Sequence, residues 1–344
     1  MTPKKKIFLL DLCMIDECNL SCDYCRNEPL ISKRSNQSKQ INKVKEGIQI
    51  MFDYIDPAII KISGYGEITL YPKFRQLLNL RGNSSLQLIT NGTLLTKGII
   101  SDLAKSDDIS LCYSLDSHTL QTNIARTKSQ KTLEKVLENL KTSIEIGIPT
   151  EINSVLTKWN TAYFHEFLSY LNELTQKSKL MVIPFPVRPF PGINNSYLFP
   201  QAEDIIKFED NVINNYKKYS NILPPYNYLK ELVTFLKRKE RGKLCYVPSF
   251  NIGINPKGDI LSCPCGPKES IGNIFSKSRV NLNKHPYETV GRWKECCSCF
   301  THYEIINLYL QGNINDNELT KVPSLYSKKA LSVLSQLKKG VLRK

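Results

Sequence analysis

The sequence of 344 residues has no apolar run approaching the roughly 18 residues that a membrane-spanning helix needs. The short apolar stretch after Lys4, Lys5 and Lys6 starts like a secretory signal, but Asp11 and Asp16 interrupt it. Eleven cysteines in 344 residues are far fewer than the roughly 8–10% cysteine content that marks a secreted disulfide scaffold. An odd number of cysteines also cannot pair fully within one chain. We therefore expect a soluble, cytoplasmic protein whose reduced thiols serve metal ligation or catalysis.

The positive charge is distributed unevenly along the chain. Hydrophobic residues make up 41% and charged residues 23%, as in ordinary globular proteins, and the net charge is +15. Residues 1–200 carry 24 Lys and Arg against 19 Asp and Glu, whereas residues 201–344 carry 23 against 13. This excess favours an anionic partner near the C-terminal part: an acidic peptide, a phosphorylated small molecule or nucleic acid. A solvated basic face that keeps the protein soluble is the alternative.

The first half of the chain alternates β-rich runs with helical periods. Predicted strands are Ile7–Met14, Ala58–Ser63, Leu86–Thr90, Ile109–Asp116, Thr150–Leu156 and Leu180–Phe185. Predicted helices are Ile41–Tyr54, Lys73–Leu80, Lys97–Ala104, Gln130–Ile146 and Ala162–Thr175. Six strands alternating with five helices indicate an α/β fold with a parallel sheet, either a closed barrel or an open partial barrel. In both cases the chemistry belongs at the carboxyl ends of the strands.

The pattern changes after a stretch that contains four prolines between Pro184 and Pro191. Two polar helical segments follow, near residues 202–219 and 226–239, and then a strand, a turn at Gly258 and a second strand. Residues 286–310 resemble a helix, and the lysines of the tail alternate with Leu331, Val333, Leu334 and Leu337 at helical spacing. We expect the tail to form an amphipathic helix with a solvated basic face.

Three cysteines, Cys18, Cys22 and Cys25, fall within eight residues just after the first predicted strand. Three thiolates in such proximity can hold three irons of a cubane cluster and leave the fourth iron without a protein ligand. An iron with an open position can bind a substrate or a cofactor. A zinc site that lacks its fourth ligand, or three unrelated loop cysteines, are the alternatives.

This C-x3-C-x2-C spacing, with Tyr24 before the last cysteine, resembles the radical S-adenosylmethionine (SAM) superfamily. The resemblance covers roughly residues 7–190 and implies a partial (β/α)6 barrel. It also implies that Cys18, Cys22 and Cys25 hold a [4Fe-4S] cluster that binds and cleaves SAM. The resulting 5'-deoxyadenosyl radical would then abstract hydrogen from an unactivated C–H bond.

Further motifs follow successive strands in the order that the family has them. Gly64, Gly66 and Glu67 resemble the family's Gly-Gly-Glu segment, which binds the SAM amino group, although Ile68 stands where the family often has proline. By the same resemblance, side chains after the third, fourth and fifth strands contact SAM: Asn91, Ser114, Asp116, Arg126 and Asn153. Arg188, after the sixth strand, is a candidate contact to substrate or SAM. Taken singly, each motif also fits a tight turn, a helix cap or a loop ion pair.

A second set of cysteines lies near the C-terminus: Cys245, Cys263, Cys296 and Cys299. The spacing C-x12-G-x4-C around Gly258 resembles the opening of the SPASM and twitch domains of radical SAM enzymes, and implies one auxiliary [4Fe-4S] cluster. A structural four-cysteine zinc site is the alternative, because spacing alone does not separate zinc from iron.

Four cysteines remain outside these sets. Cys13 and Cys112 lie in predicted strands and are expected to be buried small hydrophobic residues. Cys265 is a candidate hydrogen donor, because radical SAM peptide epimerases quench their substrate radical with a spare thiol; an inert thiol or an alternative ligand is the other interpretation. Cys297 could exchange roles with Cys296. The four histidines are scattered without paired spacing and indicate no second metal site.

These patterns predict four regions: a radical SAM partial barrel over residues 1–195, a helical linker over 196–243, a small α+β auxiliary-cluster domain, twitch-like, over 244–310, and a basic tail over 311–344. We expect no separate leader-binding domain before the first predicted strand, which weakens the peptide interpretation unless another protein delivers the leader.

The function we expect is maturation of a ribosomally made peptide by crosslinking, thioether formation or epimerisation. Oxidation of a small molecule in natural-product biosynthesis is the first alternative. A non-catalytic iron–sulfur protein that binds nucleic acid or acts as a sensor is the second. The radical chemistry also requires an electron donor such as flavodoxin or ferredoxin, whereas a nucleic-acid or membrane partner is not expected.

Overall fold

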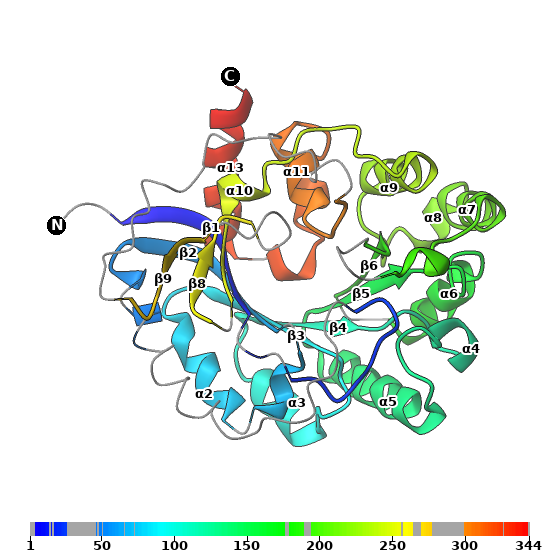
Figure 1. Ribbon diagram of the computed structural model, residues 1–344, viewed down its shortest axis with the longest axis horizontal. Coiled ribbons are helices and arrows are strands. Elements are labelled where there is room, and N and C mark those ends of the chain that lie inside the picture. Colours follow the sequence, from blue (N-terminus) through cyan, green and yellow to red (C-terminus); the bar gives the residue numbers. More distant parts are fainter. Residues whose placement is uncertain are drawn as a thin grey trace.

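The computed structural model describes residues 4–13, 15, 17–25, 46, 48–49, 51–64, 66–71, 73–175, 179–188, 194–255, 257–263, 270–276, 299–325 and 327–342. In Figure 1 a strongly curved sheet crosses the molecule, with helices along its convex side. None of the helices in this part of the chain is long and apolar enough to cross a membrane.

Six parallel strands form the body of the sheet, each paired with the next strand in the sequence. They are β1 (Lys5–Cys13), β2 (Ile55–Ser63), β3 (Ser85–Thr90), β4 (Ile109–Ser114), β5 (Thr150–Leu156) and β6 (Leu180–Pro186). Their interiors are almost continuously buried, as is usual for parallel strands covered on both faces. The predicted α/β fold with a partial (β/α)6 barrel is confirmed.

The connecting helices lie on the outer face of this sheet (Figure 1). They are α2 (Phe74–Leu78), α3 (Lys97–Leu103), α4 (Leu120–Asn123), α5 (Gln130–Ile146) and α6 (Phe164–Leu174). The α5 helix begins where the side chain of Ser129 accepts a hydrogen bond from the backbone N–H of Thr132, and it has the predicted bounds. Half of the predicted helix over 41–54 lies outside the described residues, and residues 46, 48–49 and 51–52 are helical.

Some predicted strand ends differ from the observed ones for a local reason. β2 starts at Ile55, earlier than its apolar run, because it continues to pair with β1, where Lys5 is opposite Ile55. β4 ends at Ser114, two residues early, because the backbone N–H of Asp116 turns away to donate to Asn123 Oδ1 at 3.1 Å.

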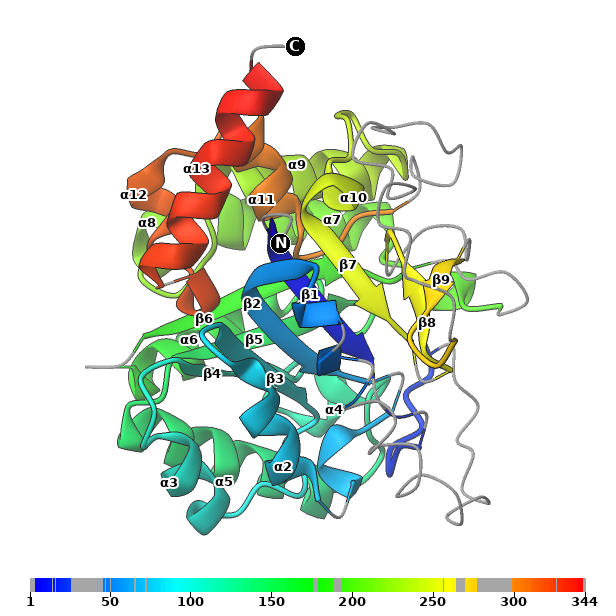
Figure 2. The same ribbon diagram turned by 90° about the vertical axis from the view of Figure 1, so that its left-hand side faces the viewer.

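The C-terminal third extends the same sheet beyond β1. β7 (Asn251–Ile254) pairs in parallel with β1, and β8 (Asp259–Leu261) and β9 (Ser270–Asn273) follow as antiparallel neighbours, shown in yellow in Figure 2. The predicted turn at Gly258 is confirmed: its φ of 81° is left-handed, and a Cβ there would lie 2.5 Å from the Phe275 ring. The strands after residue 244, where the sequence predicts a separate small domain, therefore belong to the same sheet as the barrel strands.

Some helices of the second half lie on the open side of the barrel, and others continue the outer row of helices beyond α6 (Figure 1). They are α7 (Ala202–Phe208), α8 (Tyr216–Tyr219), α9 (Tyr226–Arg238), α10 (Val247–Phe250), α11 (Glu304–Leu310), α12 (Asp316–Leu319) and α13 (Lys328–Leu342). A π-helical turn, Glu209–Ile213, and non-helical residues before Tyr216 interrupt the helix predicted near 202–219. The helical tail is confirmed, with Val333 and Leu334 buried and Lys328 and Lys339 exposed.

A buried polar network joins the C-terminal region to the inside of the barrel. Asp11 and Lys61 face each other on β1 and β2 and form an ion pair of 3.2 Å, each about 4% exposed. The Tyr303 hydroxyl donates to Asp11 at 2.8 Å, and Lys61 contacts both Tyr303 and His302 Nε2. Charges this deeply buried need such partners, so the segment around Tyr303 completes the barrel interior.

A second buried contact ties the segment before α13 to β5. Glu151 accepts hydrogen bonds from the backbone N–H of Ser324 at 2.8 Å and from Gln87 Nε2 at 2.8 Å, and its side chain is buried. Burial raises the pKa of the Glu151 carboxyl above its ordinary value of 4.5. The folded state therefore favours the protonated carboxyl more than the unfolded chain does.

The direction of the Glu151 pKa shift predicts how the stability of the protein changes with pH. The contribution of Glu151 is fully present below pH 4.5 and is lost as pH rises toward its raised folded-state pKa. In Glu151→Gln the amide keeps an acceptor for Ser324 and carries no charge, so the variant should gain stability over the wild type as pH rises above about 4.5. Urea unfolding from pH 4.5 to 7.5 measures this difference, and Glu145→Gln on the exposed end of α5 is the control. A difference that stays constant with pH contradicts the prediction.

Candidate active site

The segments that follow the carboxyl ends of the parallel strands converge on one cavity of about 340 Å³. Its walls come from every one of the six barrel strands or the loop after it. The lining residues are Cys18, Leu20, Cys22, Tyr24, Cys25, Gly64, Gly66, Glu67, Ile89, Thr90, Asn91, Ser114, Arg126, Val155, Phe185, Pro186 and Arg188. The structure thus brings together most of the residues that the sequence indicates for the first cluster and SAM.

The loop with the three cysteines is held by the barrel at several points. The backbone N–H of Cys25 donates to the Cys22 carbonyl at 3.0 Å, which turns the loop between these two thiols. Next to them, the Tyr24 hydroxyl donates to Asp116 Oδ2 at 2.5 Å, and the backbone N–H of Asp23 donates to the Ala125 carbonyl at 2.8 Å. All three cysteines are half-buried and line the cavity.

Burial disfavours the ionised form of two of these thiols. It raises the pKa of Cys22 to about 12 and also raises the pKa of Cys18. Arg126 works against this effect at Cys22, whereas Asp116 adds to it. Without metal, Cys18 and Cys22 are therefore protonated at neutral pH, and a metal centre that binds them must displace these protons.

Glu67 is a buried carboxylate, 2% exposed, that organises another part of the cavity wall. Its Oε1 accepts from Thr90 Oγ1 at 2.7 Å and from the backbone and side chain of Thr69, and its Oε2 accepts from the backbone N–H of Asn91 at 2.6 Å. Its own N–H donates to the Glu17 carbonyl at 2.7 Å. Glu67 therefore links the loop after β1, the loop after β2 and the end of β3.

Arg126 and Asp116 form a buried ion pair of 2.9 Å beside the cysteine loop. Burial alone would lower the pKa of Arg126, but the Asp116 carboxylate, Tyr24 and Cys22 raise it, so the guanidinium stays charged. Asp116 is 1% exposed and does not line the cavity, because its carboxylate is occupied by Tyr24, Arg126 and the backbone N–H of Val155. The structure thus places Asp116 behind Arg126.

Two buried polar atoms near the cavity have no hydrogen-bond partner among the described residues: Arg126 Nε and Asn153 Oδ1. Unsatisfied buried polar groups are rare in native proteins and often mark a missing ligand or water. Asn153 lies opposite Ser114 in the β4–β5 pairing, and Ser114 lines the cavity. Thiols on one wall with a carboxylate and unsatisfied polar atoms on the others fit a [4Fe-4S] cluster that carries SAM. No three His, Cys, Asp or Glu side chains in the described part of the chain lie close enough to hold a single metal ion.

The predicted auxiliary ligands are only partly described. Cys245 and Cys263 are buried and Cys299 is half-buried, while Cys296, Cys297 and Cys265 lie outside the described residues. Arg241 precedes Cys245 in the sequence and contacts the segment that begins at Cys299. Its Nε donates to the Cys299 carbonyl at 3.1 Å, and its Nη2 pairs with Glu304. The two other spare cysteines, Cys13 and Cys112, are confirmed as buried.

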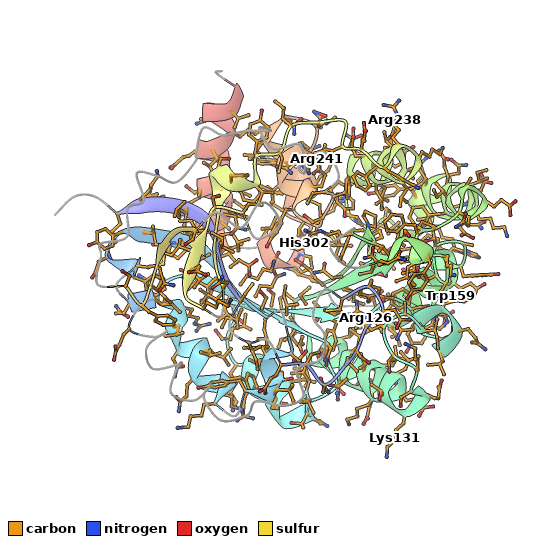
Figure 3. The ribbon with its side chains drawn as sticks, in the orientation of Figure 1. Arg126, Lys131, Trp159, Arg238, Arg241 and His302 are labelled. Carbon is orange, nitrogen blue, oxygen red and sulfur yellow. The ribbon has the colours of Figure 1, made fainter. Side chains whose placement is uncertain are left out.

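Sequence reasoning missed two features of this site. Leu20, Val155, Phe185 and Pro186 form apolar parts of the cavity wall, which no motif indicates. His302 approaches the same wall from the far end of the chain, with its ring 6.3 Å from that of Phe185, and Figure 3 shows it in the opening between β1 and β6. Both features depend on the folded chain, so no local pattern could have revealed them.

Residues 12–171 match the family described as the radical SAM superfamily. The match runs from the end of β1 into α6 and includes the cysteine loop and Glu67. Residues 12–171 therefore match a radical SAM domain, and the fold and the cavity agree with this match.

Curated relatives that match in sequence include three from different organisms. An uncharacterized protein from Methanocaldococcus jannaschii, MJ0907, is 26% identical over 286 residues, which covers 80% of this chain and 91% of that protein. Neomycin C epimerase from Streptomyces fradiae is 26% identical over 38% of this chain and 40% of its own length. The mycofactocin maturase MftC from Mycobacterium tuberculosis is 29% identical over 44% of this chain and 38% of its own length. The chain thus spans less than half of the two relatives with a named function.

Two solved structures share the fold. Native anSMEcpe with bound AdoMet has a TM-score of 0.61 and 16% sequence identity, covering 97% of this chain and 99% of that one. Streptococcus suis SuiB bound to the precursor peptide SuiA has a TM-score of 0.59 and 18% identity, covering 82% of this chain and 66% of that one.

The packing around Gly64 yields a test of the site. A Cβ at this position would lie 2.7 Å from Ile15 Cγ2 and 2.9 Å from the Ile15 carbonyl, so Gly64→Ala must push the β1 and β2 loops apart. We expect a loss of about 1–3 kcal/mol of stability and a large fall in iron content after anaerobic reconstitution. Thermal unfolding and an iron assay measure both.

Gly98→Ala is the matched control, because Gly98 lies in α3 with no clash beyond an ordinary contact at 3.9 Å. It should keep its iron and gain roughly 0.5–1 kcal/mol of stability. If Gly64→Ala binds as much iron as Gly98→Ala, the loop packing does not shape the site.

Proposed function

We propose that this protein is a radical SAM enzyme that generates a 5'-deoxyadenosyl radical for hydrogen abstraction and acts on a ribosomally made peptide. The observation that carries the proposal is the shared cavity of about 340 Å³ with Cys18, Cys22 and Cys25 on one wall and Glu67 on another. When bound there, the [4Fe-4S] cluster and SAM supply that radical.

The chain's own residues would bind and orient SAM. Cys18, Cys22 and Cys25 are the proposed iron ligands. The Glu67 carboxylate, oriented by Thr90 and the Asn91 N–H, would accept a hydrogen bond from the SAM amino group, together with the backbone at Gly64 and Gly66. A fixed carboxylate suits this task because it needs no rearrangement when SAM binds.

The SAM carboxylate and ribose would meet the other polar groups of the cavity. Arg126, Ser114 and Asn153 are the proposed contacts, since Arg126 Nε and Asn153 Oδ1 are buried without a partner among the described residues. Asp116 acts through Arg126: the ion pair of 2.9 Å holds the guanidinium against the cavity. Asn91 lines the cavity beside Glu67 and is a further proposed contact.

The apolar side of the cavity would hold the substrate and exclude water. Val155, Phe185 and Pro186 form this wall, and Arg188 lies at its edge. A radical formed here must react with a held C–H bond before solvent quenches it, so a dry wall protects the reaction.

A second cluster is proposed at Cys245, Cys263, Cys296 and Cys299. Arg241 supports this assignment, because its hydrogen bond to the Cys299 carbonyl and its ion pair with Glu304 fix the backbone at one proposed ligand. Four protein thiolates leave no open iron, which suits electron transfer and hence net oxidation of the substrate. The proposed regions stay as predicted: barrel 1–195, linker 196–243, auxiliary-cluster region 244–310 and tail 311–344.

The relatives support more than one substrate class. Mycofactocin maturase is named for maturation, and SuiB is solved with its precursor peptide. Neomycin C epimerase is named for a small molecule and favours oxidation or epimerisation of such a substrate as the alternative. Cys265 stays a proposed hydrogen donor for the epimerising case.

The radical chemistry has a direct test. Anaerobically reconstituted protein with dithionite and SAM should release 5'-deoxyadenosine, and Cys18→Ala should reduce the product to background, because the cluster loses one of its three ligands. Cys112→Ala is the control, since Cys112 is a buried strand residue outside the cavity. Liquid chromatography of the quenched reaction quantifies the product. Reconstituted wild-type protein that holds its cluster yet releases none would refute the enzyme assignment.

The auxiliary site has a separate test in the iron content. Two [4Fe-4S] clusters predict about eight irons per chain, and a Cys18/Cys22/Cys25 triple alanine variant should keep about four. Iron and sulfide assays on the reconstituted proteins give both numbers. A triple variant without iron excludes the auxiliary cluster, and zinc in place of iron supports the structural alternative.

A further inference from the structure

An exposed aromatic and cationic surface lies beside the cysteine loop. Trp159 is 42% exposed and Tyr197 is 54% exposed, although both are large aromatic side chains. The Lys158 ammonium lies 4.8 Å from the centre of the Trp159 ring and 5.6 Å from that of Tyr197, so it holds the two rings together. We call Lys158, Trp159 and Tyr197 the rim surface.

The rim surface is connected to the cysteine loop through a small buried cluster of side chains. The backbone N–H of Lys158 donates to the Leu198 carbonyl at 2.9 Å, which joins the two segments that build the surface. Leu198 belongs to a small buried cluster with Ala125, Val155 and Val187, and Tyr24 packs against this cluster. Tyr24 stands between Cys22 and Cys25, so the rim surface lies on the outside of the wall that supports the proposed iron ligands.

The charge of the rim surface is not neutralised by the described residues. No carboxylate among them lies within ion-pair distance of Lys158, whereas Lys128, on the other flank of the cysteine loop, pairs with Asp23 at 2.5 Å. A second such cation, Lys239, lies 5.7 Å from the ring of Phe199, two residues after Tyr197. The surface therefore offers positive charge and aromatic area to an acidic partner.

The position of the rim surface discriminates between acidic partners. Lys158, Trp159 and Tyr197 do not line the cavity, so a substrate bound there would not touch them. Two cations are also too few for nucleic acid, whose binding depends on neutralising many phosphates. Aromatic side chains with a nearby cation are typical hot spots of protein–protein interfaces.

We propose that the rim surface is the docking site of an acidic one-electron donor protein of the flavodoxin type, which delivers an electron to the cluster behind Tyr24. This inference rests on the proposed function, because only a cluster at Cys18, Cys22 and Cys25 needs an electron from outside. Docking here places the donor on the other side of the buried cluster against which Tyr24 packs. In Figure 3, Trp159 extends outward on the same side of the molecule as Arg126.

The test measures binding of oxidised flavodoxin to the full-length, cluster-loaded protein by calorimetry at low and moderate salt. Lys158→Glu should weaken binding roughly tenfold and reduce its salt dependence, and Trp159→Ala should weaken it to a similar degree. Lys131→Glu is the matched control, because Lys131 is exposed on α5, away from the rim surface (Figure 3). Its affinity should stay within about twofold of the wild type.

SAM cleavage with two reductants separates docking from chemistry. Lys158→Glu should cleave SAM at the wild-type rate with dithionite, which needs no docking site, but several times more slowly with reduced flavodoxin. Equal flavodoxin affinity and equal flavodoxin-driven rates in Lys158→Glu and the wild type would overturn the proposal. Binding of an acidic peptide or RNA to the rim surface in place of flavodoxin would also overturn the proposal. Wild-type protein that binds flavodoxin through Lys158 but cleaves no SAM with dithionite would contradict the proposed function and leave the docking site standing.

Discussion

The carboxylate of Asp116 is the contact on which the geometry of the site depends. It accepts hydrogen bonds from Tyr24 in the cysteine loop, from Arg126 at the cavity and from the backbone N–H of Val155 on β5. Charge-assisted hydrogen bonds in a buried place are strong, and losing one partner leaves an uncompensated charge. One carboxylate thus fixes the cysteine loop, the Arg126 guanidinium and the apolar wall relative to each other.

Other buried contacts of the barrel also hold the walls of the cavity in place. Glu67 ties the loops after β1 and β2 to the end of β3, and the Asp11–Lys61 ion pair continues the polar interior toward Tyr303. A partial barrel leaves its interior open between the first and last strands. The buried charges beside this opening need polar partners. Tyr303 and its neighbours fill that gap, so residues near the end of the chain belong to the same physical unit as β1.

The sequence allowed the barrel and most of the cavity to be predicted, for reasons that are local. β5 and α5 have the predicted bounds because their apolar periods and the Ser129 cap are complete within the segments themselves. The motif residues converge because parallel strands place their carboxyl ends at one edge. Features that depend on residues far apart in the sequence could not be predicted. They are the pairing of β7 with β1, the Asp11–Lys61–Tyr303 network and the burial of Asp116 away from the cavity.

Cys18, Cys22 and Cys25 are proposed to hold a cluster whose open iron binds SAM in the cavity beside Glu67. Electron–nuclear double resonance of the reduced protein with SAM labelled by ¹⁵N at its amino group tests this proposal most directly. A ¹⁵N coupling to the reduced cluster is expected, because SAM bound at the open iron would bring its amino group close to the cluster, and this coupling should be lost in Glu67→Ala. A reduced cluster that shows no ¹⁵N coupling at saturating SAM would contradict the proposal.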